Sequence, residues 1–80
     1  MIDYKKYISI NPDIRFGKPC VIGTRMSVGD ILRWLASGMT SEEIHEDFPE
    51  IFKEHILAAL AYSAQREKSV KTIFHDKTAV

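Results

Sequence analysis

The sequence is poor in cysteine and has no excess of charge of either sign. Among its 80 residues there is one cysteine, Cys20, so no intrachain disulfide can form, which is typical of proteins in a reducing cytosol. Basic and acidic residues number 11 each, and this balance disfavours a protein that binds nucleic acid over a broad basic surface. Any DNA contact must therefore come from a local patch.

Long apolar runs are also absent. No stretch is long enough to cross a bilayer, and Lys5 and Lys6 are not followed by the apolar segment of a signal peptide. We therefore expect a cytoplasmic protein without membrane contact. The core of so short a chain is thin, and a second subunit often completes such a core, so we expect a homodimer.

The spacing of apolar residues predicts a mainly α fold, a three-helix helix-turn-helix (homeodomain-like) domain with a small N-terminal β-hairpin element. Ser27 is a good N-cap for a first helix over Val28 to Ser37, and Asp30 favours the same end of that helix. Gly38 can adopt the left-handed conformation that ends a helix. One apolar stripe, at i, i+3, i+4 and i+7, consists of Val28, Ile31, Leu32 and Leu35.

Two further helices are expected after Gly38. Thr40 and Glu43 form a capping-box pattern at the start of a short helix over Ser41 to Asp47, which Pro49 cannot continue. A third helix is expected from about Phe52 to Lys68.

The third helix has two sides that differ in character. The side expected to face the core consists of Ile56, Leu57, Leu60, Ser63 and Ala64. The opposite side consists of Glu54, His55, Ala58, Tyr62, Gln65 and Arg66. This second side has small residues beside an aromatic ring, which suits the close approach of another chain. A solvated face of an alanine-rich helix explains it equally well.

The segments at either end are less regular. Residues 8–26 are expected to form two or three short strands, with Ile14 to Phe16 extended and Arg25-Met26 returning the chain. We expect one domain over residues 1–68. Residues 69–80 are expected to be a poorly ordered tail, or a segment that folds on a partner with Ile73 and Phe74 as anchors.

Patterns of catalytic or metal-binding residues are lacking. Gly17-Lys18-Pro19 and Gly23-Thr24-Arg25 do not fit a phosphate-binding loop and are better explained as turns, with contact to a phosphate backbone or an acidic partner as the alternative. The soft ligand candidates, none at a recognised metal spacing, are Cys20, His45, His55 and His75. We expect no enzyme activity, metal or cofactor.

The helix-turn-helix suggests DNA binding, because its second helix commonly enters the major groove. The candidate DNA-contacting residues are Lys53, His55, Arg25, Lys18 and Arg33. Glu54 would repel phosphate, and a helix-turn-helix that serves as a protein-binding scaffold is the rival hypothesis.

Several motifs resemble a known family when taken together. They are Gly17-Lys18-Pro19, Gly23-Thr24-Arg25, the run from Leu35 to Ile44, Asp47-Phe48-Pro49 and the run from Ile56 to Tyr62. In this order they resemble a prokaryotic family catalogued as domain of unknown function 433. The resemblance implies a helix-turn-helix with a small β element and, for many members, the role of a type II (VapB-type) antitoxin whose toxin is a PIN-like ribonuclease. The chain departs from the family pattern at Phe52 and Lys53, where a helix-capping pair is common.

These observations lead to an antitoxin-like protein that binds a PIN-like toxin, with operator DNA as a second ligand. The alternatives are a stand-alone helix-turn-helix regulator that binds DNA, and a dimeric protein-interaction module that does not. The residues expected to contact a protein partner are Ala58, Tyr62, Arg66, Ile73 and Phe74.

Overall fold

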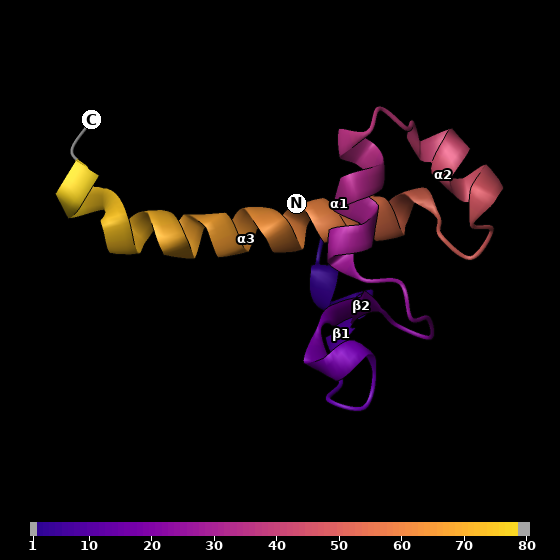
Figure 1. Ribbon diagram of the computed structural model, residues 1–80, viewed down its shortest axis with the longest axis horizontal. Helices are drawn as coiled ribbons and strands as arrows, with labels where there is room; N and C mark the ends of the chain where they lie inside the picture. The colour runs from indigo at the N-terminus through magenta and orange to yellow at the C-terminus, as the bar shows by residue number, and fades with distance from the viewer. Residues whose placement is uncertain (1, 79–80) are drawn as a thin grey trace.

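The computed structural model describes the backbone of residues 2–78 and the side chains of residues 2–67. The chain forms a small antiparallel hairpin followed by three helices (Figure 1), which confirms the predicted fold class. The elements are, in order, the 3-10 helix η1 (Tyr4–Lys6), β1 (Ile8–Ile10), the 3-10 helix η2 (Arg15–Gly17), β2 (Pro19–Val21), α1 (Val28–Ala36), α2 (Ser41–Asp47) and α3 (Lys53–Thr78). Within the described residues, no helix is both long and apolar enough to cross a membrane.

The hairpin pairs within one chain. Ile8 lies opposite Val21, and the side chains of both are buried against the helices. The return of the chain expected at Arg25-Met26 is reduced to a single bridge, in which the Val21 N–H donates to the Met26 carbonyl at 2.9 Å.

The prediction of an extended segment at Ile14 to Phe16 was wrong. Arg15 and Phe16 both have positive φ, 51° and 58°, and with Gly17 they form the left-handed turn η2. Such a conformation strains residues other than glycine and persists where the surrounding structure holds it. Here the Arg15 guanidinium donates to the Arg25 carbonyl at 2.9 Å and to Asp30 Oδ2 at 3.1 Å.

Asp30 is the centre of a hydrogen-bond network at the start of α1. Its Oδ2 accepts the Ser27 N–H at 3.0 Å, and the Ser27 hydroxyl accepts the Asp30 N–H at 3.0 Å, so the two residues form a capping box. The carboxylate also pairs with Arg15 and Arg33. Partial burial raises the pKa of the Asp30 carboxyl, but hydrogen bonds from the Ser27 backbone and from Arg15 outweigh burial and hold the pKa below its ordinary value.

The connection between α1 and α2 follows the predicted capping signals. Gly38 has a φ of +99°, its N–H donates to the Leu35 carbonyl, and the Met39 N–H donates to the Trp34 carbonyl, which together make a Schellman motif. Thr40 and Glu43 then form the capping box of α2. Hydrogen bonds between neighbouring residues therefore end α1 and begin α2.

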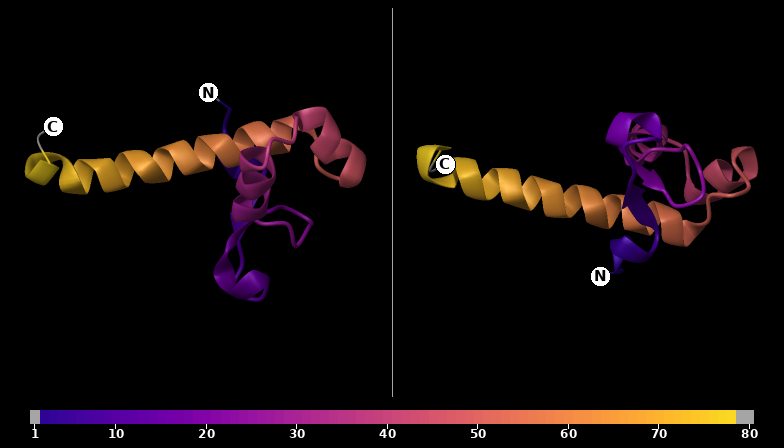
Figure 2. Two further views of the ribbon diagram at one scale, coloured as in Figure 1. Left: turned by 45° about the horizontal axis from the view of Figure 1, so that its top comes forward. Right: turned by 90° about the horizontal axis from the view of Figure 1, so that it is seen from below.

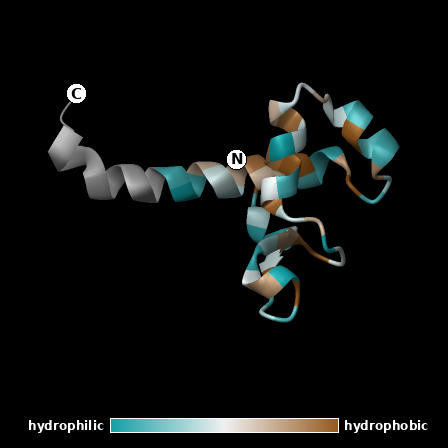
Figure 3. Ribbon diagram, viewed as in Figure 1, coloured by the Kyte–Doolittle hydropathy of each residue, from teal (hydrophilic) through white to brown (hydrophobic). Residues whose placement is uncertain are grey.

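The core lies where α1 crosses α3 (Figures 1 and 2), and hydrophobic residues of α3 are concentrated at that crossing (Figure 3). Ala58 and Ala59 of α3 are fully buried in this core. The other buried apolar residues of this cluster are Ile8, Val21, Val28, Ile31, Ile44, Ile51 and Ile56.

The predicted orientation of the third helix was right only in part: Ile56 is buried as expected, but other residues are not placed as expected. Leu57 and Leu60, expected in the core, are 43% and 44% exposed, whereas Ala58 is buried and Tyr62 packs edge-on against Tyr4 with ring centroids 5.4 Å apart. Tertiary contacts determine which side of α3 is buried, because α1 and the N-terminal segment cover the side that carries the smaller residues.

α3 continues well past the body of the domain (Figure 2). The helix was expected to end at about Lys68 but extends to Thr78, and its 26 residues run along the longest dimension of the molecule, 43 Å. The backbone shows no break at residue 69, where a separate tail was expected.

Replacing Asp30 by asparagine should destabilise the fold by about 1–2 kcal/mol at neutral pH, because the substitution removes the negative charge that two guanidinium groups contact and weakens the cap. The folded-state pKa lies below the unfolded value of about 3.9, so the contribution of the carboxylate is complete above that value and is lost as the pH falls through the folded-state pKa. Urea unfolding of both proteins should show a stability difference that shrinks in acid. Asp13→Asn, at an exposed turn, is the control and should change little; equal effects of the two substitutions would contradict the central role of Asp30.

Ala58→Leu should destabilise the protein by about 1–3 kcal/mol, because the larger side chain overfills the crossing between α1 and α3. Ala36→Leu makes the same chemical change at an exposed position of α1 and should leave stability within about 0.5 kcal/mol. Thermal unfolding followed by circular dichroism compares the two. If Ala58→Leu were harmless, α1 could not lie directly on this side of α3.

Candidate protein-interaction surface

The residues predicted to bind DNA fall into two groups. Lys53 and His55 lie at the start of α3, whereas Lys18 and Arg25 belong to loops around the hairpin and Arg33 belongs to α1. In Figure 1 the hairpin lies below α3, whereas the start of α3 adjoins α2.

In the first group, only Lys53 is fully exposed. The His55 ring is half-buried, its Nδ1 accepts the Phe52 N–H at 2.9 Å, and it lies edge-on to Tyr7 with centroids 5.6 Å apart. His55 thus helps to cap α3, at the point where the usual capping pair is missing. Its side chain is occupied by structural contacts.

In the second group, one carboxylate, that of Asp30, is shared by two guanidinium groups. Arg33 pairs with Asp30, and Arg15 bridges the same Asp30 and the Arg25 carbonyl. Lys18 and Arg25 are exposed, and neither takes part in an ion pair within the described side chains.

The surface around the helix-turn-helix is acidic. Residues 41–54 contain one cationic side chain, Lys53, and six exposed carboxylates: Glu42, Glu43, Glu46, Asp47, Glu50 and Glu54. Phosphate contacts supply much of the affinity of a DNA-binding protein, so this surface is electrostatically unsuited to approach a duplex.

His45 and His55, both candidate metal ligands, instead make hydrogen bonds within the segment that joins α2 to α3. His45 Nδ1 donates to the Ile51 carbonyl at 2.9 Å, and its ring lies 4.7 Å from that of Phe52. Phe48 stacks on Trp34 at 4.2 Å on the other side of the turn. No group of three or more potential metal-binding side chains occurs among the residues that the structure describes.

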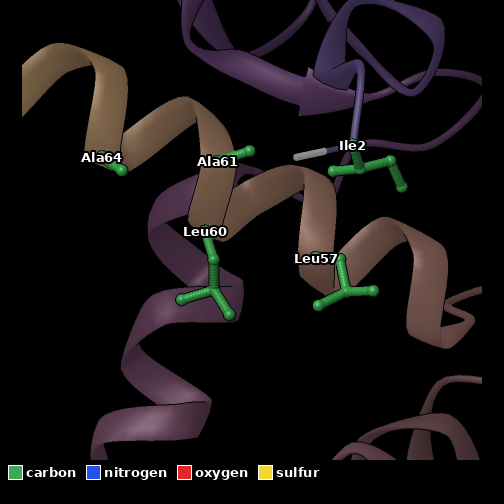
Figure 4. Close-up of a pocket in the computed structure, with 5 residues that line it drawn as sticks. All are labelled: Ile2, Leu57, Leu60, Ala61 and Ala64. Atoms are coloured by element: carbon green, nitrogen blue, oxygen red, sulfur yellow. The ribbon is translucent and has the colours of Figure 1, made fainter.

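An exposed apolar surface lies on α3. We call it the α3 stripe, and it consists of Ile2, Leu57, Leu60, Ala61 and Ala64, of which Ala61 is itself buried. Leu57 and Leu60 project from the same side of the helix and Ile2 of the N-terminal segment lies alongside it (Figure 4). The five residues border an open hollow of about 320 Å³. Two large apolar side chains exposed side by side make this surface a candidate for contact with another protein.

The residues predicted to contact a protein partner are differently placed. Ala58 is in the core, and Tyr62 is half-buried beneath Tyr4 and Arg66. Arg66 is exposed, with its guanidinium 5.9 Å from the Tyr62 ring centroid. The side chains of Ile73 and Phe74 lie outside the described residues.

Sequence reasoning missed the α3 stripe because it assigned those leucines to the core. The signal was present, since Leu57, Leu60, Ala61 and Ala64 recur at i, i+3, i+4 and i+7. Ala58, Ala59 and Tyr62 form a second apolar side, however, and the period alone does not say which side is buried.

The order of its elements makes the chain a small, mainly α helix-turn-helix domain with a β-hairpin at its N-terminus. The chain belongs to the family described as protein of unknown function (DUF433), which matches residues 8–63. The chain is similar to a solved structure of a DUF433 member protein from Anabaena variabilis ATCC 29413, with a TM-score of 0.71 at 22% sequence identity, over 85% of this chain and 67% of that one. This likeness shows the fold. No curated protein matches the chain.

Proposed function

We propose that the protein is a non-catalytic, antitoxin-like subunit that works by binding other proteins. The observation that carries this proposal is the α3 stripe, in which two leucines remain more than two-fifths exposed beside Ile2 and two alanines. Complete burial of a leucine side chain is worth about 1.5–3 kcal/mol, so covering the exposed part of Leu57 and Leu60 contributes roughly 1 kcal/mol each.

The charge around the helix-turn-helix favours protein over DNA as the partner. In a DNA complex, the start of α3 would enter the major groove between two rows of phosphates, and Glu42 and Glu54 lie there beside Lys53. The same carboxylates suit a basic protein surface.

The length of α3 supports a helical binding mode. The helix continues to Thr78, beyond the part of it that α1 and the hairpin cover (Figure 1). Helices that extend from a folded body commonly bind a groove on a second protein. The sequence motifs resemble those of proteins paired with PIN-like ribonucleases, and we propose a nuclease of this kind as the partner.

Co-expression with the product of the neighbouring reading frame should give a stable complex in size-exclusion chromatography with light scattering. Truncation after Glu67 should abolish the complex and leave the fold intact, because the core cluster lies within residues 8–59. Truncation after Thr78 is the matched control and should retain binding. A neighbour that never co-elutes, or that binds equally well after truncation at Glu67, would count against the proposed partner or against the role of the helix end.

DNA binding tests the alternative function. We expect the protein at micromolar concentration to give no specific mobility shift with its own upstream DNA at low salt, and Lys53→Ala to change nothing. A salt-dependent shift on a defined sequence, weakened by Lys53→Ala and unchanged by Lys5→Ala, would instead establish a DNA-binding regulator.

A further inference from the structure

Two opposite charges stand at the ends of the apolar part of α3. Lys53, Leu57, Leu60, Ala64 and Glu67 follow one another at steps of four, three, four and three residues, which is the spacing of a coiled-coil seam. Lys53 and Glu67 are exposed, and neither takes part in an ion pair with another described side chain. The seam therefore runs from a positive end through an apolar middle to a negative end.

We infer that the α3 stripe is covered by the α3 helix of a second copy of this chain, in antiparallel orientation and centred on Leu60. In this register Lys53 faces the partner's Glu67, and the twofold axis repeats the pair at the other end. A parallel pair would instead place like charges side by side at both ends, which is unfavourable. Charge thus selects both the orientation and the register.

The sizes of the side chains agree with this register. Leu57 faces the partner's Ser63, with Ala64 next to it, so that a large residue meets small ones, while Leu60 meets its own symmetry mate at the centre. Ala61 and Ala64 leave the open hollow of about 320 Å³ into which a leucine of the second copy fits. Helices with small residues at the contact approach to about 8 Å, which closes such a hollow.

Ile2 extends the contact beyond the two helices. It lies alongside α3 next to the stripe (Figure 4), so each chain adds an apolar side chain from a second segment. The buried surface remains modest for a dimer, and we expect dissociation to be measurable by dilution.

This inference rests on the proposed function only in treating the stripe as a protein contact. It assigns the stripe to a second copy and leaves the end of α3 for the proposed nuclease. The two ideas can therefore fail separately.

The test is sedimentation equilibrium of the full chain over a micromolar dilution series, with circular dichroism to show that each variant is folded. The wild-type chain should dimerise. Lys53→Glu and Glu67→Lys should each weaken the dimer about tenfold, because each places like charges in contact twice per dimer. The double variant, with the charges exchanged, should recover the wild-type affinity, and Lys18→Glu, far from the stripe in sequence, should have no effect.

Leu60→Glu provides an independent test, because it places two carboxylates together at the twofold axis and should give a monomer. A wild-type chain that is monomeric throughout, or a double variant that does not recover, would overturn the inference. A dimer that ignores Leu60→Glu would do the same. A monomer whose complex with the neighbouring gene product is lost in Leu60→Glu would show that the nuclease partner covers the stripe, which would uphold the proposed function alone.

Discussion

The Asp30 carboxylate joins the start of α1 to a turn that lies 15 residues earlier in the sequence. It accepts the Ser27 N–H and so completes the cap of α1. It also forms ion pairs with Arg15 of the strained turn η2 and with Arg33, one turn further along α1. Arg15 in turn reaches the Arg25 carbonyl, so the loop before α1 is held by the same network. The hairpin is too small to be stable alone, and its position against the helices depends on this network as well as on the burial of Ile8 and Val21.

The crossing of α1 over α3 imposes the second constraint. Two alanines, Ala58 and Ala59, are fully buried on the side of α3 that packs into the core. The larger side chains Leu57 and Leu60 are consequently left on the open side. The packing that builds this thin core thus also creates the apolar stripe, and the position of the interaction surface follows from the way the core is filled.

The helix-turn-helix here carries six exposed carboxylates and one cationic side chain over residues 41–54. The two histidines that might have met a ligand hold the turn, since His45 bonds the Ile51 carbonyl and His55 accepts the Phe52 N–H. The carboxylates of α2 surround the start of α3. The fold alone does not define a function, which depends on the side chains that its surface carries.

The sequence by itself determined the features that depend on neighbouring residues. The capping boxes at Ser27 and Thr40, the end of α1 at Gly38 and the bounds of α2 could all be read from the chain, because each depends on hydrogen bonds within one turn. Only the tertiary structure decided the left-handed turn at Arg15, which depends on an acceptor 15 residues away. It also decided which side of α3 is buried, because both sides of that helix are apolar and the choice depends on which one α1 and the N-terminal segment cover.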